Sequence, residues 1–167
     1  VKGHHRCRRY IMKKEYISHN PVSKNKDIVK TNPFGAKRNI LKPTAEVDNE
    51  VGFIMIKGLD GEWISTLANY ASHYAGDWDV DTITSDFYGV FANQMHSNLS
   101  ATDNFIGMLS YGTGGDVNTW DFNKSKQVLK TDFKRATLIG KTIANAIFHN
   151  IKGLVWEENP ILEMKYK

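Results

Sequence analysis

The apolar positions of this chain first predict a pair of β-strands. Residues 51–57 and 63–70 are two runs rich in β-branched and aromatic side chains, and the turn sequence Asp60-Gly61 lies between them. Aspartate and glycine tolerate the positive φ angles that tight hairpin turns require. The two runs are therefore predicted to pair as antiparallel neighbours.

A helix and another strand are predicted to follow this hairpin. Apolar side chains recur at helical spacing in residues 87–98, and either Ser85 or Asp86 can cap that helix by accepting a hydrogen bond from a free backbone N–H. Residues 105–111 then form an apolar run that is typical of a buried strand. Together with strand 63–70, this order predicts a βαβ crossover between parallel strands.

The remaining sequence divides the chain into two parts. Residues 132–150 place apolar side chains on one face of a predicted helix that stops near Gly153. Residues 1–45 are punctuated by proline and glycine and are predicted to be a mostly irregular arm. A loop-rich stretch of this length is unusual in a compact domain, so we expect it to pack against parts of a larger protein. Residues 46–167 are predicted to form an α/β core, a mixed β-sheet layer with flanking helices, that is part of one larger domain.

The distribution of charge suggests a role for the arm of residues 1–45. Residues 1–43 hold twelve Lys and Arg against two acidic residues, whereas residues 44–167 hold ten against sixteen. A basic arm of this kind can bind nucleic acid or an anionic membrane surface through phosphates, or it can fold back on the acidic body. We favour the second interpretation, because the aromatic residues of the arm are not spaced as a stacking platform for bases. Nucleic acid is therefore not an expected partner.

Composition and motifs exclude several classes of protein. With 167 residues, 41% of them hydrophobic, the chain can bury a sizeable core. No run approaches the roughly 20 apolar residues that span a bilayer. The motifs HExxH, GxSxG and CxxC are absent. The acidic loop with Asp77, Asp79 and Asp81 lacks the glycine and the closing glutamate of an EF-hand, so it is interpreted as a solvated loop rather than a calcium site.

Candidate chemistry lies at the ends of two predicted strands. The run Leu67–His73 delivers an imidazole to its end, and the glycine-rich loop Gly112–Asn118 follows strand 105–111. If the two strands are parallel, both segments lie at the same edge of the sheet. Gly114 and Gly115 would let backbone N–H groups approach a ligand there. The ordinary alternative is a histidine that is simply held by a backbone hydrogen bond.

Several short motifs between residues 7 and 121 occur in an order that resembles a known family. They resemble the N-terminal catalytic domain of the neutral/alkaline, non-lysosomal ceramidases, and are most similar to the bacterial ceramidase-like hydrolases. The resemblance implies an αββα-type domain of which this chain is an internal part. The motifs that carry it include Cys7-Arg8-Arg9-Tyr10, Asn69-Tyr-Ala-Ser-His73, Thr84-Ser-Asp86 and Gly115-Asp-Val-Asn118.

The resemblance implies a zinc amidohydrolase that acts on an N-acyl lipid. Zn²⁺ would lower the pKa of a bound water, which attacks the acyl amide, and would polarise the amide carbonyl. The resemblance also favours a secreted or periplasmic protein. The implied roles are zinc ligand for His73, substrate binding for Arg8, Gly114 and Gly115, catalysis for Asn118 and Asp116, and structural support near the site for Ser85 and Asp86.

The chain also departs from the family pattern. Asn118 stands where the family has a catalytic serine, and Thr119 stands where it has proline. Asparagine can donate a hydrogen bond to an oxyanion but cannot act as a nucleophile. His73 matches one of four expected zinc ligands; the others are expected from the remaining part of the same protein or from another chain.

Two hypotheses of function follow. The first is a zinc-dependent hydrolase that cleaves an amide, with an N-acyl sphingoid lipid as the implied type of substrate. The alternative is a non-catalytic α/β binding domain whose basic arm contacts an anionic partner or membrane surface.

Overall fold

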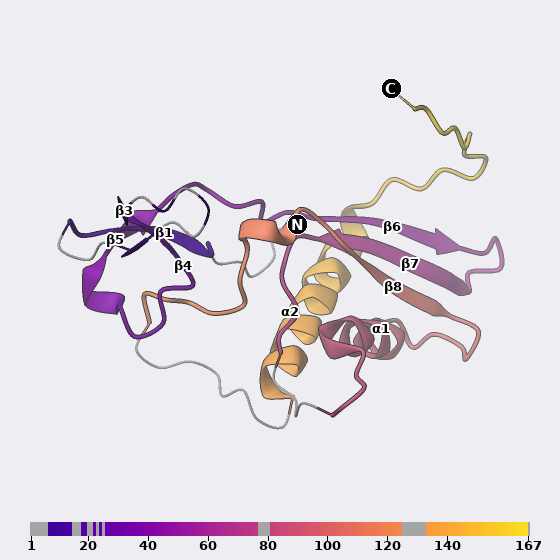
Figure 1. The fold of residues 1–167 in the computed structure, drawn as a ribbon. Helices are drawn as coiled ribbons and strands as arrows, with labels where there is room; N and C mark the ends of the chain where they lie inside the picture. Colours follow the sequence, from indigo (N-terminus) through magenta and orange to yellow (C-terminus); the bar gives the residue numbers. More distant parts are fainter. Residues whose placement is uncertain are drawn as a thin grey trace.

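The computed structural model describes residues 7–14, 18–19, 22, 24, 26–76, 81–124 and 133–166. In these residues the strands form three small sheets, and two long helices accompany the largest of them (Figure 1). The elements are β1 (Arg9–Met12), β2 (Ser18–His19), β3 (Lys26–Asp27), β4 (Val29–Thr31), the 3-10 helix η1 (Lys37–Asn39), β5 (Ile40–Pro43), β6 (Val51–Lys57), β7 (Trp63–Tyr70), α1 (Asp86–Leu99), β8 (Ile106–Tyr111), η2 (Gly114–Asp116), α2 (Lys134–Asn150) and η3 (Ile151–Gly153).

The largest sheet has the strand order β6-β7-β8. β6 runs antiparallel to β7, from Val51 opposite Tyr70 to Lys57 opposite Trp63. β8 runs parallel to β7, and α1 forms the connection between them. The predicted hairpin and the predicted βαβ crossover are therefore confirmed, and the carboxyl ends of β7 and β8 lie at the same edge of the sheet.

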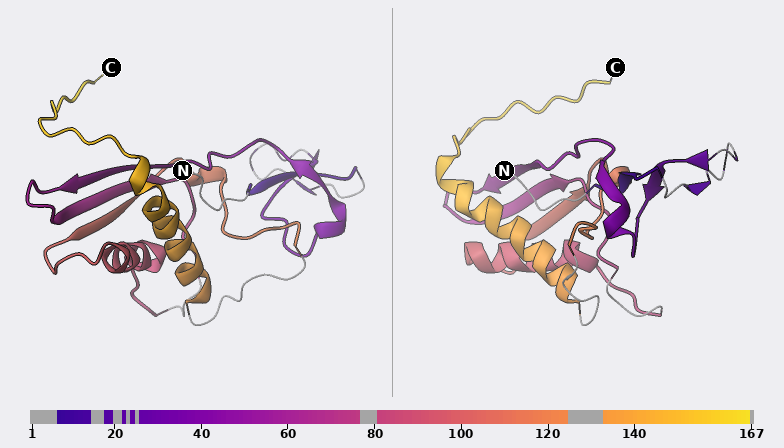
Figure 2. Two further views of the ribbon diagram at one scale, coloured as in Figure 1. Left: turned by 180° about the vertical axis from the view of Figure 1, so that it is seen from behind. Right: turned by 90° about the vertical axis from the view of Figure 1, so that its left-hand side faces the viewer.

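Both long helices cover one face of this sheet (Figure 2). Strand side chains on that face, such as Tyr70, pack against Phe87 and Phe91 of α1 and Ile143 of α2, and each of these four side chains is at most 1% exposed. At Gly140 the backbones of the two helices approach closely, because a Cβ there would lie 2.7 Å from the carbonyl oxygen of Phe87. The core of the α/β part lies between the helices and the sheet.

The opposite face of the same sheet carries an exposed apolar row. Ile54, Leu67 and Met108 lie side by side across the three strands. Their exposed fractions are 64%, 41% and 42%. Contiguous exposed apolar surface of this kind usually marks an interaction surface. That residues 46–167 are part of one larger domain stays a prediction.

The arm holds more regular structure than its loop-rich sequence predicts. β1 pairs with both β4 and β5, and β2 pairs with β3. Strands of two to four residues are too short to show a hydrophobic period, so their pairing is not visible in the sequence. The side chain of Tyr10 packs edge-on against Phe122, with ring centroids 5.7 Å apart. The arm therefore has a packing partner within this chain.

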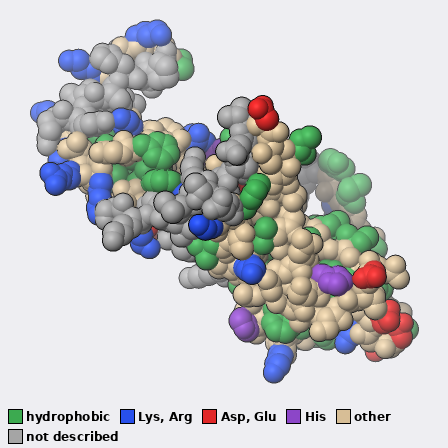
Figure 3. All heavy atoms as spheres, turned by 90° about the horizontal axis from the view of Figure 1, so that it is seen from below, with side chains coloured by type: hydrophobic (Ala, Val, Ile, Leu, Met, Phe, Trp, Pro, Cys, Tyr) green, Lys and Arg blue, Asp and Glu red, His purple; other side chains and the backbone are tan. Residues whose placement is uncertain are grey.

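Charge is distributed as the sequence indicates. Lys and Arg side chains gather over the N-terminal sheets, whereas several Asp and Glu side chains lie at the far end of the α/β part (Figure 3). No helix among the described residues is long and apolar enough to cross a membrane. After η3 the chain extends away from the body (Figure 1), although Trp156 still contacts Trp63 at a centroid distance of 5.7 Å.

Candidate functional site

The site lies where the loops after β7 and β8 meet. The N–H of Gly112 donates to the carbonyl oxygen of Tyr70 at 3.0 Å, and the N–H of His73 donates to the carbonyl oxygen of Val117 at 3.3 Å. The first bond extends the parallel pairing by one residue, and the second joins the two loops beyond the strands. The imidazole and the glycine-rich loop are thus at the same edge of the sheet, as the βαβ prediction required.

The arm brings an arginine to this edge from the other end of the sequence. Cys7 forms an isolated β-bridge with Val117, and the N–H of Arg8 donates to the carbonyl oxygen of Asp116 at 2.6 Å. The guanidinium Nη1 of Arg8 is hydrogen-bonded to Nε2 of His73. Nε of Arg8 is buried and has no hydrogen-bond partner among the described residues. The structure therefore joins Arg8 and His73, which are 65 residues apart.

His73 is held by its own loop. Its carbonyl oxygen accepts a hydrogen bond from Ser72 Oγ at 3.0 Å, and two residues further on the N–H of Ala75 donates to Asp86 Oδ2 at 2.7 Å. Partial burial lowers the pKa of His73 from its usual 6.5, and the positive charge of Arg8 lowers it further. Nε2 accepts the hydrogen bond from Arg8, because a guanidinium can only donate, and the lowered pKa favours the neutral imidazole that this requires.

Asp86 connects this loop to helix α1. Its carboxylate is 6% exposed, and Oδ1 accepts the N–H of Phe87 in addition to the bond from Ala75. Ser85 precedes the helix but makes no side-chain capping bond, so of the two predicted caps only Asp86 bonds to the helix N-terminus. Asp86 has a φ of 51°, in the left-handed region. Its carboxylate thus holds both the start of α1 and the segment that carries His73.

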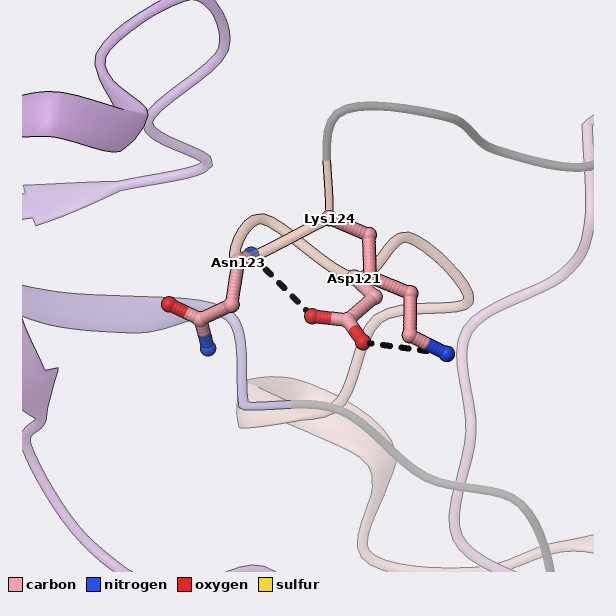
Figure 4. A network of polar contacts seen from close by, with 3 residues as sticks. All are labelled: Asp121, Asn123 and Lys124. Atoms are coloured by element: carbon pink, nitrogen blue, oxygen red, sulfur yellow. Dashed lines mark hydrogen bonds and ion pairs between the residues drawn. The ribbon is translucent and has the colours of Figure 1, made fainter.

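Asn118 is fixed between the arm and the glycine-rich loop. Its Nδ2 donates to Oδ1 of Asn32 at 2.9 Å, and its own Oδ1 accepts the N–H of Trp120 at 2.8 Å. The following turn is closed by Asp121, which accepts the N–H of Asn123 at 3.0 Å and lies 3.8 Å from Lys124 Nζ (Figure 4). This turn places the intervening Phe122 in the small core of the arm.

These segments surround an open cavity of about 220 Å³. Arg135 of α2 also lines it, although the sequence did not single it out: it is 3% exposed and stacks over Trp120 at 4.6 Å from the ring centroid. The available signal was that Arg135 lies on the apolar face of the helix, one turn before Ile139. The described lining residues are Arg8, Asn32, Phe34, His73, Tyr74, Ala75, Gly76, Asn118, Thr119, Trp120 and Arg135.

Three other predicted site residues lie in η2, outside this lining. A Cβ on Gly114 would lie 2.6 Å from the hydroxyl oxygen of Tyr111, so this glycine allows close packing of the loop on β8. Gly115 faces open space. The backbone oxygen of Asp116, rather than its carboxylate, makes the contact with Arg8. The acidic loop was predicted from Asp77, Asp79 and Asp81; the first two lie outside the described residues.

The described residues do not form a zinc site on their own. Across residues 7–76, 81–124 and 133–166, as far as they are described, no three His, Cys, Asp or Glu side chains are grouped closely enough to hold a metal ion. Nε2 of His73 faces the guanidinium of Arg8, and a positive charge there opposes binding of Zn²⁺ to that nitrogen. His73 therefore stays a single predicted ligand.

Two solved structures are similar in fold to part of this chain. The neutral ceramidase from Pseudomonas aeruginosa is similar over 64% of this chain and 17% of its own chain, with a TM-score of 0.52 and 15% sequence identity. A structure described as ceramidase complexed with C2 matches over 60% of this chain and 16% of its own, with a TM-score of 0.48 and 13% identity. No family model and no curated protein sequence matches the chain. At this identity the similarity shows the fold alone: the chain has the mixed α/β architecture of a small part of a neutral ceramidase.

Proposed function

We propose that this chain is part of a ceramidase-like hydrolase that cleaves an amide bond, with an N-acyl lipid as the type of substrate. The observation that supports it is convergence: Arg8, His73 and Asn118 come from three distant segments and line one cavity. The resemblance assigns all three residues to the site. The similarity in fold to part of a neutral ceramidase points to the same class of enzyme.

The residues of this chain would bind and orient the substrate. Arg8 offers guanidinium N–H groups to an oxygen of the substrate. Asn118 uses one N–H of its amide on Asn32, and the second N–H is suited to an oxyanion. Neutral His73 holds Arg8 in place by accepting its hydrogen bond.

Completion of the active site would need residues beyond those described. The matched region is 17% of the ceramidase chain, so the rest of the protein or another chain would supply the other groups. The resemblance implies Zn²⁺ as cofactor, and a bound zinc ion would supply an activated water. The described residues alone do not complete a zinc site.

The test uses the full-length protein, purified and washed after incubation with zinc. We expect stoichiometric zinc by elemental analysis and release of fatty acid from N-acyl substrates, and we expect His73→Ala to reduce that release strongly. Lys37→Ala, an exposed change in the arm, is the matched control. Absence of bound zinc together with no release of fatty acid would end the hydrolase proposal, and unchanged hydrolysis in His73→Ala would remove His73 from the active site.

One observation supports the alternative, a non-catalytic binding domain. Lys and Arg side chains gather over the N-terminal sheets (Figure 3), which suits an anionic surface. Binding to vesicles that contain anionic lipid should then weaken as salt concentration rises, because exposed charges are screened. Binding that does not respond to salt would exclude this alternative.

A further inference from the structure

A second cavity, of about 450 Å³, lies at the other end of β7 from His73, and we call it the distal cavity. It is formed where α1 and α2 end beside Trp63, the first residue of β7. β7 has eight residues, and a strand rises roughly 3.3 Å per residue, so the two ends of β7 are roughly 23 Å apart. The distal cavity is therefore separate from the candidate site.

The walls of the distal cavity are mainly apolar. Its lining includes Trp63, Leu99, Phe148 and Ile151. Phe148 is 39% exposed, so an apolar occupant would remove aromatic surface from water. The volume of about 450 Å³ lies within the range of roughly 300–1,000 Å³ that is usual for small-molecule sites. Shape and composition together favour a small apolar ligand.

Contacts within the chain already hold these walls in place. Lys57 Nζ lies 4.8 Å from the ring centroid of Trp63, and the ring of Trp156 packs against the same indole at 5.7 Å. Asn98, which also lines the cavity, donates through Nδ2 to Oδ1 of Asn145 at 2.9 Å and so joins α1 to α2. A ligand would enter a space that is largely formed in advance, so little order has to be imposed on the protein when it binds.

The polar part of the lining indicates what kind of head group the ligand has. Lys152 and His149 line the cavity, and its described lining residues include no Asp or Glu. Lys152 forms no ion pair with any described residue. The C-terminal ends of α1 and α2 carry partial negative charge, which limits the attraction of an anion. Most of the affinity must therefore come from the apolar part of the ligand, and the negative head group adds less.

We propose that the distal cavity binds an unbranched fatty acid, with its hydrocarbon chain against Trp63, Phe148 and Ile151 and its carboxylate beside Lys152. This second site goes beyond the proposed amide hydrolysis and does not depend on it, because the two cavities lie at opposite ends of β7. If the protein releases no fatty acid from any N-acyl substrate, the hydrolase proposal fails and the distal site is unaffected.

A series of chain lengths tests the apolar part of this assignment. The probes are hexanoate, octanoate and decanoate, each added to the full-length protein at concentrations where it is monomeric, and calorimetry measures their affinities. Burial of one methylene group strengthens binding about fourfold, so octanoate should bind at least about tenfold more tightly than hexanoate. An affinity that does not rise with chain length overturns the proposal, and so does tighter binding of 1-naphthoate than of decanoate.

Matched head groups test the carboxylate. Decanoate should bind about two- to fivefold more tightly than decanol, because an exposed ion pair contributes little. Decylammonium should bind more weakly than decanoate, because Lys152 repels its charge. Lys152→Gln should reduce the affinity for decanoate to that for decanol, whereas Lys141→Gln, an exposed change on α2, should not. Decylammonium that binds as tightly as decanoate, or no preference for decanoate over decanol, refutes the carboxylate beside Lys152.

Variants of the walls locate the bound chain. Ile151→Trp should fill the cavity and abolish binding of decanoate, and Phe148→Ala should weaken it at least about tenfold, because a large apolar contact is lost. Leu138→Ala, which changes a 44% exposed side chain of α2 outside the lining, is the matched control. Unchanged binding in folded Ile151→Trp and Phe148→Ala variants, checked by circular dichroism, contradicts the assignment.

The cavity beside His73 provides the remaining comparison. Asn118→Ala changes a residue that lines that cavity, and it should leave the binding of decanoate unchanged. Binding that is lost in Asn118→Ala but retained in Ile151→Trp would place the fatty acid beside His73 and overturn the proposal.

Discussion

Removal of the Asp86 carboxylate tests how the site is held in place. The carboxylate is 6% exposed and accepts backbone N–H groups from Ala75 and Phe87. Hydrogen bonds to a charged group are worth about 1.5–3 kcal/mol each, so loss of both predicts a decrease of about 3–6 kcal/mol in the free energy of unfolding. Domains of this size have about 5–15 kcal/mol in total, so the variant should remain folded but be much less stable.

The backbone conformation at Asp86 allows the loss of the carboxylate to be separated from the cost of backbone strain. Asp86 has a φ of 51°, which glycine adopts freely and alanine does not. A left-handed conformation costs alanine roughly 1–2 kcal/mol, and the greater freedom of glycine in the unfolded chain offsets about 0.5–1 of this. Asp86→Ala should therefore be about 0.5–1 kcal/mol less stable than Asp86→Gly, and both should be far less stable than the unmodified protein.

Urea unfolding followed by circular dichroism measures both differences, and amide resonances locate the change. Those of His73 and Ala75 should move most in Asp86→Gly, because the lost hydrogen bond joins their segment to α1. Ser85→Ala is the matched control, since Ser85 makes no capping bond through its side chain. Stability of Asp86→Gly within about 0.5 kcal/mol of the unmodified protein would refute the role assigned to this carboxylate.

Two further predictions concern the imidazole and the helix crossing. In zinc-free protein, His73 should titrate below pH 6.5, and Arg8→Gln should raise its midpoint only in part, because burial is the larger cause. The unfolded chain binds the proton more tightly, so the contribution of neutral His73 to the free energy of unfolding is present above pH 6.5 and is lost as pH falls. An NMR titration midpoint of His73 at or above pH 6.5 would contradict the contact with Arg8. Gly140→Ala should lower the free energy of unfolding by up to about 2 kcal/mol, because overpacking against Phe87 costs about 1–3 kcal/mol and the gain in helix propensity offsets about 1 kcal/mol of that. Gly153 has open space around it, so Gly153→Ala should not lower the free energy of unfolding. Urea unfolding of both variants measures this, and a more stable Gly140→Ala variant would contradict the close crossing.

Local sequence signals predicted the elements that carry the site. The Asp60-Gly61 turn between two β-rich runs specifies the hairpin, and the helical spacing after Ser85 specifies α1. Parallel pairing of β7 and β8 then follows from the length of the connection between them. The order of the elements alone therefore predicts that the loops carrying His73 and Asn118 lie at one edge of the sheet, as they do.

Other features were not predictable, because they depend on contacts between distant segments. The strands of the arm are two to four residues long and are stabilised by partners such as Phe122, more than 100 positions away. In the sequence Arg135 is an ordinary charged residue of a helix. In the structure its guanidinium packs over Trp120, and Arg135 lines the cavity. Gly114 resembled a ligand-binding glycine, but its missing side chain allows close packing on Tyr111.

The sequence by itself determined the order of strands and helices in the α/β part, because hydrophobic period and turn chemistry act over a few neighbouring residues. It also identified His73 as the residue at a strand end. Only the tertiary structure decided which side chains lie close to His73 at that strand end. The β-bridge between Cys7 and Val117 brings Arg8 next to His73, where its guanidinium is hydrogen-bonded to Nε2. Arg135, at the start of α2, lines the same cavity. Local patterns do not encode such long-range contacts, so the sequence alone could not place the strand-end histidine His73 in a cavity that Arg8 and Arg135 also line.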